Sequence, residues 1–327
     1  MQTHWYLVAD IGGTNARFAA YEGDRLAMSV SHEVAGCDDL LSLAVAFCKT
    51  LPARPAIAVV AAAGPVENNA VTLTNANHTI SGGALRQATG AERAYVINDF
   101  AAAAWATADI GPGDVKAIAG GADPDLRPGT RVIIGPGTGL GIGALVFDGV
   151  RYQCVTGEGG HIGLGARTAY ETSVFQTLRH LWPEVFFGET LIMEAEGILG
   201  GVGLPLLYRA VQMTDGQAVI PLTPEEIFRR AKAGNDPAAG RTIAIFKAHL
   251  ARLSGDLGMI FGPTSSVIFV GGMALKNPWL FDAGFRTLMS EGGRFSRARS
   301  ALNLYLFQHD NFGLRGAHKF AKRQSMT

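Results

Sequence analysis

Two glycine-rich turns, each between two apolar runs, constrain the fold of this chain most strongly. The first is "LVADIGGTNARFAAY" near the N-terminus, and the second is "RVIIGPGTGLGIGALVF" from Arg131 onward. Short apolar runs bounded by glycine predict strands joined by tight connections. Because Gly-rich hairpins are common, these two segments alone leave two readings open, unrelated hairpins or a duplicated unit. A third glycine pair, Gly271 and Gly272 after the run "SSVIFV", favours the duplicated unit.

The runs around these turns predict a mixed α/β chain. In the first third, "WYLVAD", "PAIAVVAAAG" and "AYVIND" have the composition of strands, and a helix is expected over about residues 38–50. After the second turn the pattern becomes mainly helical. A helix is expected to begin after the N-cap residue Thr223, which Pro follows, and to end at Gly234. A long helix after Asp236, the strands "SSVIFV" and "LNLYLF", and a closing helix after Gly313 complete the prediction.

The charge balance, the cysteines and the lengths of the apolar runs exclude several classes of protein. Lys plus Arg (28) equals Asp plus Glu (28), so no net field attracts nucleic acid or an anionic membrane. Cys37, Cys48 and Cys154 are scattered and form neither a CxxC pair nor a disulfide ladder. The N-terminus lacks the features of a signal peptide, and the longest apolar runs are too short to cross a bilayer. We therefore expect a soluble, cytoplasmic protein without nucleic-acid or membrane partners.

The first turn, "DIGGT", carries the groups that a phosphate requires. Gly12 and Gly13 leave backbone N–H groups accessible to an anion, Thr14 adds a hydroxyl, and Asp10 is placed to address a hydrated cation. The same pattern recurs around Thr138 in "GPGTGLG", and in "FVGGMALK" two glycines follow a strand where a flat ring can rest against backbone. The chain has neither a Walker A motif nor a GxGxxG fingerprint. Each of the three clusters is weak evidence by itself.

Together and in this order, the three clusters resemble the phosphate 1, phosphate 2 and adenosine elements of the sugar kinase, Hsp70 and actin superfamily. The similarity is closest to bacterial ATP-dependent glucokinases and extends through "ADIGGTNARF", "AGPV", "INDF", "GPGTGLG", "GEGGHI", "GVGL", "VGG" and "HDNFGLRGAH". It implies a two-domain α/β protein with the ribonuclease H-like (actin-like ATPase) fold, with the domains around a cleft. The small domain would be residues 1–107, to which the C-terminal helix 313–327 returns, and the large domain 108–312. ATP and glucose as substrates, Mg²⁺ as cofactor and a homodimer are also implied.

The resemblance implies a role for each matching residue. Asp99 of "INDF" would be the general base that takes the proton from the sugar 6-hydroxyl. Sugar hydroxyls both donate and accept hydrogen bonds, and the residues implied to bind them are Asn98, Glu158, His161 and Glu196, with Glu194 as the second choice for the last position. The residues implied to line the nucleotide and its phosphates are Asp10, Gly12, Gly13, Thr14, Asn15, Gly137, Thr138, Gly139, Gly271 and Gly272. Asp10 would reach Mg²⁺ through a water molecule.

Simpler readings of the same residues are compatible with the sequence. Asp99 directly precedes "FAAAAW" and has the chemistry of a helix N-cap, a role that can coexist with catalysis. The segment "GEGGHIG" also reads as a Gly-rich surface turn. Glu194 and Glu196 are compatible with a helix on which both face water.

Two departures from the family pattern concern the sugar pocket. Glucokinases of this group usually have Trp three residues after the Asn of "TN" (Thr74 and Asn75), where this chain has His78. After the His of "EGGH" the family commonly has an Asp and an aromatic residue, where this chain has Gly163 and Leu164. A kinase for another hexose, or one that uses polyphosphate, therefore remains an alternative. A sugar-sensing regulator without catalysis is a second alternative, because a fold does not fix a function.

Overall fold

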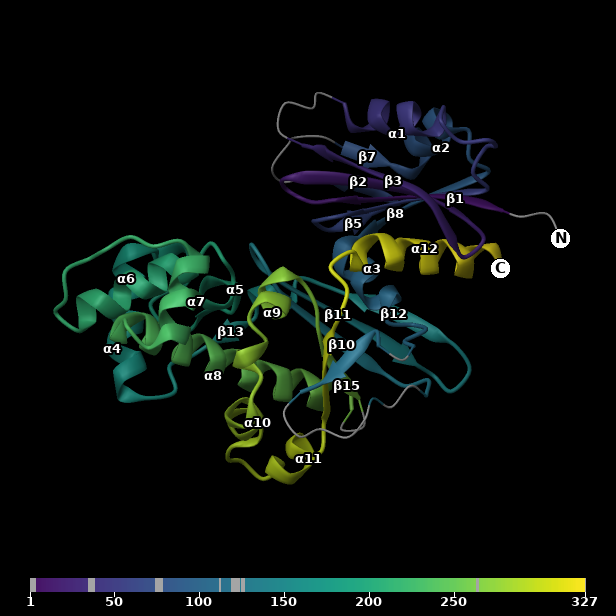
Figure 1. The fold of residues 1–327 in the computed structure, drawn as a ribbon. Helices are drawn as coiled ribbons and strands as arrows, with labels where there is room; N and C mark the ends of the chain where they lie inside the picture. Colours follow the sequence, from purple (N-terminus) through teal and green to yellow (C-terminus); the bar gives the residue numbers. More distant parts are fainter. Residues whose placement is uncertain are drawn as a thin grey trace. The chain divides into compact units, whose positions relative to one another are not determined.

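The computed structural model describes residues 4–34, 39–73, 79–111, 113–118, 124, 127–262 and 265–326. Cys37, Thr74, Asn75 and His78 lie outside the described residues. The chain divides into two compact units (Figure 1). Unit 1 comprises Met1–Gly111, Gly143–Gly157 and Asn311–Thr327, and unit 2 comprises Pro112–Ile142 and Glu158–Asp310.

Unit 1 is built on a five-stranded sheet with the order β3-β2-β1-β4-β8. Strands β1, β2 and β3 are antiparallel neighbours, whereas β1, β4 and β8 run parallel. Runs predicted as strands in the first third of the chain form β1, β2, β4 and β8 of this sheet, whereas the edge strand β3 was not predicted. The bounds are β1 Trp5–Ile11, β2 Asn15–Glu22, β3 Arg25–Glu33, β4 Ile57–Ala62 and β8 Arg93–Asn98.

Helices cover both faces of this sheet. Helices α1 and α2 lie on one face, and α3 and α12 lie on the other (Figure 1). Alternate residues of β4 enter the two cores, with Ala58 and Val60 packing toward α1 and Val59 and Ala61 toward α3. This period of two is expected of a strand whose two faces are both buried. The helices are α1 Leu40–Cys48, α2 Gly82–Thr89, α3 Asp99–Ala106 and α12 Phe312–Ser325.

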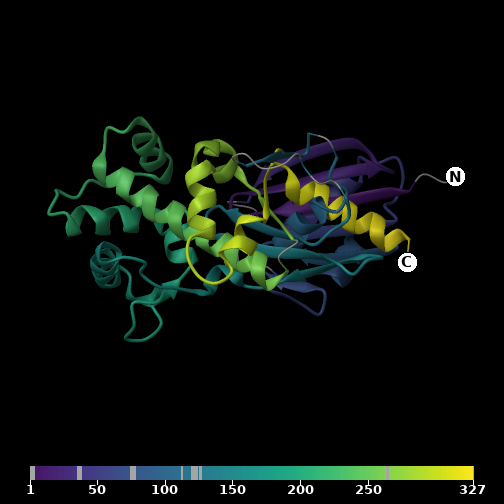
Figure 2. The ribbon, with the colours of Figure 1, turned by 90° about the horizontal axis from the view of Figure 1, so that it is seen from below.

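The backbones of α3 and α12 approach each other closely. A Cβ atom placed on Gly316 of α12 would lie 1.6 Å from the carbonyl oxygen of Ala102, so only glycine fits. On another side of α3, a Cβ atom on Gly143 would lie 3.0 Å from the carbonyl oxygen of Phe100. The alanine-rich sequence of α3 therefore serves close packing and not only helix propensity. In both views α12, drawn in yellow, runs beside the purple N-terminal strands (Figures 1 and 2).

Unit 2 contains most of a six-stranded sheet with the order β12-β11-β10-β15-β16-β9. Its strands β10, β15 and β16 are parallel, and β9 is an antiparallel edge strand. The division between the units falls within β11, after Ile142, so that β12 is grouped with unit 1. The bounds are β9 Val115–Ala117, β10 Arg131–Pro136, β11 Leu140–Phe147, β12 Tyr152–Thr156, β15 Ser266–Phe269 and β16 Asn303–Phe307.

The helices of unit 2 share one hydrophobic core with its sheet. The predicted helix after Thr223 is confirmed, because the Thr223 hydroxyl caps the amide of Glu226 and Gly234 ends the helix at φ +69°. The predicted long helix is α8, whose N-cap is Asp236. No helix in the described part of the chain is long and apolar enough to span a membrane. The main helices are α4 Ala169–Leu181, α6 Leu204–Thr214, α7 Pro224–Ala233, α8 Pro237–Ile260 and α10 Ala283–Ser290.

Candidate active site

Three motifs of unit 1 follow the carboxyl ends of neighbouring strands and therefore lie at the same end of the sheet. In the parallel register Ile11 of β1 pairs with Ala62 of β4, and Ala62 pairs with Asn98 of β8. The segments "DIGGT", "AAAGP" and "IND" therefore stand side by side at the carboxyl ends of their strands. In open α/β sheets this edge is the usual place for ligands.

Asn98 and Asp99 lie where β8 passes into α3. The side-chain Oδ1 of Asn98 accepts hydrogen bonds from the amides of Phe100 (2.8 Å) and Ala101 (3.3 Å), so Asn98 is the N-cap of the helix. Its Nδ2 donates to the carbonyl oxygen of Gly64 at 3.0 Å, which ties "IND" to "AGPV". The reading of Asp99 as the N-cap is thus wrong. Asp99 is the first residue of α3, and its Oδ1 accepts a hydrogen bond from the amide of Phe100 at 2.9 Å.

The turn between β1 and β2 exposes the backbone of the first glycine cluster. The amide of Gly12 donates to the carbonyl of Asn15 at 2.9 Å, and Gly12, Gly13 and Thr14 are exposed to solvent. A Cβ atom on Gly12 would find its nearest neighbour at 3.7 Å, an ordinary contact distance. Space does not require glycine at position 12. The bare backbone is consistent with the predicted contact to an anion.

Asp10 lies at the base of this turn. Burial raises the pKa of the Asp10 carboxyl, and the Arg17 guanidinium, 3.6 Å from it, opposes that shift. A Cβ atom on Gly313 would lie 2.5 Å from the Asp10 carboxyl carbon, so the first turn of α12 rests directly against this side chain. Within the described residues no group of three or more His, Cys, Asp or Glu residues is placed to hold a metal ion. A single carboxylate nevertheless fits Mg²⁺, which usually keeps several waters and binds through one or two carboxylates and substrate phosphates.

The second and third glycine clusters follow the carboxyl ends of two neighbouring strands in unit 2. Strands β10 and β15 are parallel neighbours, so the turn after Pro136 and the pair Gly271 and Gly272 emerge together. Gly271 has φ +93°, a conformation that favours glycine, and a Cβ atom there would lie 3.7 Å from the carbonyl oxygen of Pro136. Gly272 begins the short helix α9 (Gly272–Lys276).

The turn at residues 137–139 is held by a second glycine-rich segment. The amide of Gly137 donates to the carbonyl of Gly139 at 2.8 Å. The amides of Gly201 and Val202 donate to the carbonyls of Gly137 (2.8 Å) and Thr138 (3.1 Å). The "GVGL" motif of the sequence therefore supports the turn through its backbone.

Glu196 supports the same turn with its side chain. Its Oε2 accepts a hydrogen bond from the amide of Leu140 at 2.7 Å. A Cβ atom on Gly139 would lie only 2.2 Å from that oxygen, so the carboxylate occupies the space that glycine leaves. Glu196 opens the short helix α5 (Glu196–Leu199) and is only partly exposed, and Glu194 lies on strand β14. The reading of both residues as water-facing positions of one helix is wrong.

The segment "EGGH" packs against the start of β11. Residues Gly159–His161 form one 3₁₀ turn, and a Cβ atom on Gly160 would lie 2.2 Å from the carbonyl oxygen of Leu140, so the turn requires glycine there. Glu158, just before the turn, and His161 at its end are both exposed. The reading as a Gly-rich surface turn describes the backbone correctly, and the side chains still converge.

His161 interacts with Glu194, which the sequence indicated only as a second choice for sugar binding. Its Nδ1 is 2.9 Å from Oε2 of Glu194. This hydrogen bond raises the pKa of His161, partial burial acts in the opposite direction, and the charges of Glu194, Glu196 and Glu158 raise it further. The structure thus brings together the four residues of unit 2 that were predicted for the sugar. The contact between His161 and Glu194 follows from strand pairing, for which the sequence carries no local signal.

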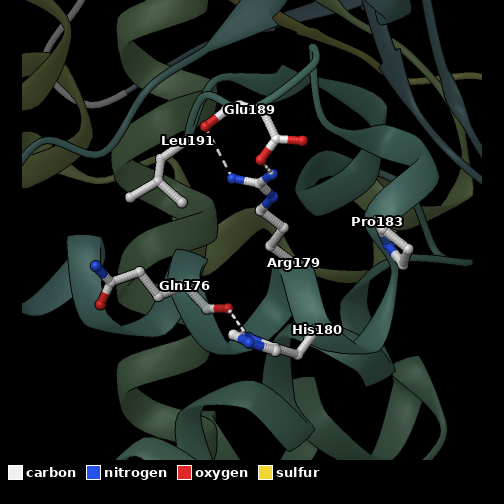
Figure 3. A pocket seen from close by; sticks show the side chains of 6 residues that line it. All are labelled: Gln176, Arg179, His180, Pro183, Glu189 and Leu191. Carbon is white, nitrogen blue, oxygen red and sulfur yellow. Dashed lines mark hydrogen bonds and ion pairs between the residues drawn. The ribbon is translucent and has the colours of Figure 1, made fainter.

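A cavity of 530 Å³ in unit 2 lies among other residues (Figure 3). It is lined by Gln176, Arg179, His180, Pro183, Glu189 and Leu191, and none of the predicted site residues lines it. Arg179 points toward Glu189 and donates to its backbone carbonyl at 2.8 Å and to its carboxylate (Figure 3). Because the guanidinium of Arg179 is already paired with Glu189, this cavity is poorly suited to bind an anion.

Known proteins with similar sequences are glucokinases. The family model of glucokinases matches residues 7–324. A glucokinase of Sinorhizobium fredii is 35% identical over 323 residues, which cover 97% of this chain and 91% of that protein. A glucokinase of Nitrobacter hamburgensis is 36% identical over 294 residues, which cover 88% of each chain.

A solved structure shows the same fold. The glucokinase from an Antarctic psychrotroph is similar with a TM-score of 0.84 and 28% sequence identity, covering 98% of this chain and 100% of that one. The predicted α/β class and actin-like ATPase fold are confirmed, as is the resemblance found from the sequence. The chain belongs to the glucokinase family and is a hexose kinase.

Proposed function

We propose that this enzyme transfers the γ-phosphoryl group of ATP to the 6-hydroxyl of glucose, with Asp99 as the general base. The observation that supports the proposal is that Asn98, and not Asp99, is the N-cap residue of α3. Asn98 accepts from the amides of Phe100 and Ala101, while Oδ1 of Asp99 also accepts from the Phe100 amide at 2.9 Å. Asp99 stands one residue further, at the carboxyl end of β8, where a ligand of this fold is expected.

The proposed reaction consists of one displacement at phosphorus. The proton of the 6-hydroxyl passes to Asp99, the hydroxyl oxygen bonds to the γ-phosphorus, and the bond to the β–γ bridging oxygen breaks. ADP leaves with that electron pair. Such transfers depend mainly on positioning and on charge stabilisation, to which a general base adds about 10²–10⁴-fold. Mg²⁺, when bound, neutralises phosphate charge, and Asp10 is the carboxylate that would hold it through water.

The nucleotide is proposed to bind the three glycine clusters. The N–H groups of Gly13 and Thr14 serve its phosphates, as do those of Thr138 and Gly139, whereas Gly12 and Gly137 line the site with their amides donated to Asn15 and Gly139 inside the turns. The left-handed Gly271 and the following Gly272 leave a bare surface for the adenine ring. Asn15 closes the first turn by accepting the hydrogen bond from Gly12.

The sugar is proposed to bind Asn98, Glu158, His161 and Glu196, each with limited capacity. The Oδ1 of Asn98 already accepts two hydrogen bonds and one Nδ2 hydrogen is donated to Gly64, so the second Nδ2 hydrogen is the group offered to a hydroxyl. Glu196 has one oxygen engaged with Leu140 and offers the other. Glu158 is exposed and accepts through both oxygens.

The test is the Asp99→Asn variant, which keeps the size of the side chain and removes its basicity. We expect kcat to fall by about 10²–10⁴-fold, while glucose binding, measured by calorimetry, changes by less than about threefold, a difference worth under 1 kcal/mol. Asp109→Asn is the matched control, because Asp109 is an exposed carboxylate of the same unit that pairs with Lys319. Turnover of Asp99→Asn close to that of the unaltered enzyme would contradict the general-base role.

Initial rates with several sugars and donors test the substrate assignment. Glucose, mannose, fructose and N-acetylglucosamine are each assayed with ATP and with polyphosphate. We expect the highest kcat/KM for glucose with ATP. Gly163 stands where the family commonly has Asp, so a higher kcat/KM for another hexose would move the assignment to the neighbouring alternative. Sugar binding without turnover would favour a regulator.

A further inference from the structure

His161 and Glu194 meet across a pair of very short strands. Strands β13 (Gly163–Leu164) and β14 (Met193–Glu194) are antiparallel, and Gly163 pairs directly with Glu194. The amide of Ala195 donates to the carbonyl of Ile162 at 2.8 Å and extends the pairing by one step. This register brings the Glu194 carboxylate back toward the 3₁₀ turn, where its Oε2 lies 2.9 Å from Nδ1 of His161.

We propose that Glu194 is a positioning residue, which orients the hydroxyl-binding His161 through Nδ1 so that Nε2–H is presented as a hydrogen-bond donor to the sugar. This inference rests on the proposed function, because it assumes that His161 contacts the substrate. Glu194 acts through His161 in this arrangement and does not itself contact the reacting atoms.

The chemistry of imidazole makes the partner at Nδ1 decisive. A neutral His carries one ring proton, so a donor at Nδ1 leaves Nε2 as an acceptor, whereas the protonated ring donates from both nitrogens. The charged groups that face His161 are Glu194 of β14, Glu196 of α5 and Glu158 before the turn, and together they raise the pKa of His161. These groups stabilise the protonated ring relative to an isolated His, and a charged donor makes a stronger hydrogen bond to a hydroxyl oxygen than a neutral donor does.

Gly163 is the residue directly across from Glu194 in this pair of strands. A Cβ atom on Gly163 would lie 2.8 Å from Cγ2 of Ile192, so the existing packing favours glycine there.

The first test measures His161 directly. In the full-length protein with ¹³C-labelled histidine, the resonance of His161 is identified by its loss in His161→Gln and is titrated by NMR. We expect Glu194→Gln to move the titration midpoint to lower pH, because the negative charge that raises the His161 pKa is removed and the hydrogen bond to Nδ1 loses its charged acceptor. Glu158→Gln should move it less, since Glu158 contributes charge without the hydrogen bond. Glu225→Gln, an exposed carboxylate on α7, should leave it unchanged.

The second test measures the sugar KM and kcat of the same variants against pH. We expect Glu194→Gln to raise the KM for glucose by about tenfold near neutral pH, the size expected for a lost charge-assisted hydrogen bond, with kcat within about twofold. The pH at which 1/KM begins to fall should move down with the NMR midpoint. Glu225→Gln is the control for KM and kcat as well.

The two tests separate this inference from the proposed function. An unchanged His161 midpoint in Glu194→Gln would overturn the inference, whatever the enzyme phosphorylates. A shifted midpoint with an unchanged KM would also overturn it, because the coupling would then serve no substrate contact. If the unaltered chain phosphorylated no sugar, the proposed function would fail, while the NMR titration would still report the coupling between the two residues.

Discussion

The glycine turns at residues 12–15 and 137–139 have different surroundings. Each follows a buried strand and is closed by one short hydrogen bond, Gly12 to Asn15 at 2.9 Å and Gly137 to Gly139 at 2.8 Å. In the first turn a Cβ atom on Gly12 would meet nothing closer than 3.7 Å. In the second turn a Cβ atom on Gly139 would collide with Glu196 at 2.2 Å.

Glycine therefore occurs in these two turns for different physical reasons. Gly139 is glycine because the Glu196 carboxylate and the 200–202 backbone fill the space beside it. Gly12 has that space and does not adopt the left-handed backbone that favours glycine. What glycine supplies at position 12 is unobstructed access to exposed N–H groups, a requirement of a ligand and not of the fold. Substitution of glycine in the second turn should therefore change stability, whereas substitution in the first turn should change nucleotide binding.

The largest effect on stability is expected for Gly139→Ala. The new methyl group displaces the Glu196 carboxylate, and the Leu140 amide then loses the acceptor that it holds at 2.7 Å. Overpacking of this kind costs about 1–3 kcal/mol, and an unsatisfied buried donor adds a similar amount. We expect a loss of about 3 kcal/mol in the free energy of unfolding, measured by urea denaturation followed by circular dichroism. A variant as stable as the parent would show that the contact between Gly139 and Glu196 does not support the turn.

Glu196→Ala should have the next largest effect. It removes the acceptor of the Leu140 amide without adding a clash, so we expect a loss of about 2 kcal/mol in the same denaturation experiment. Glu196→Gln is the matched variant, because the amide oxygen can still accept from Leu140. If Glu196 served only the sugar, both variants would retain the parent stability and only the sugar KM would rise.

The central strands of both sheets and the helices α7 and α8 were predictable from the sequence, whereas β3, β9 and β12 were not predicted. Apolar runs such as "WYLVAD" and "SSVIFV" are long enough to show strand composition, and Thr223 with Gly234 gave both ends of α7. Parallel pairing then placed the three motifs of unit 1 at one edge. The roles proposed for Asp99 and its neighbours remain predictions, because geometry alone does not show a proton transfer.

Other features depend on contacts that single-sequence reasoning does not reach. Asn and Asp are equally good N-caps, so nothing in "IND" selected Asn98 over Asp99 as the cap of α3. Strands β13 and β14 have two residues each, too few for a periodic signal, and the contact between Glu194 and His161 depends on their pairing. The approach of Gly316 to Ala102 joins residues more than 200 positions apart in the sequence.

The smallest effect on stability, and the most informative about the first turn, is expected for Gly12→Ala. Since the site has room and an ordinary backbone, we expect the free energy of unfolding to change by less than about 1 kcal/mol, with a gain as the favoured sign because alanine restricts the unfolded chain. The methyl group would nevertheless stand beside the exposed N–H groups of Gly13 and Thr14 and hinder the approach of a phosphate. The KM for ATP should rise by about tenfold, as expected for one lost hydrogen bond to a charged group, while the sugar KM stays near its original value. Initial rates at varied ATP, with urea denaturation of the same preparation, measure both quantities. A destabilised Gly12→Ala would mean that glycine serves the fold in both turns, and an unchanged KM for ATP would remove the first turn from the nucleotide site.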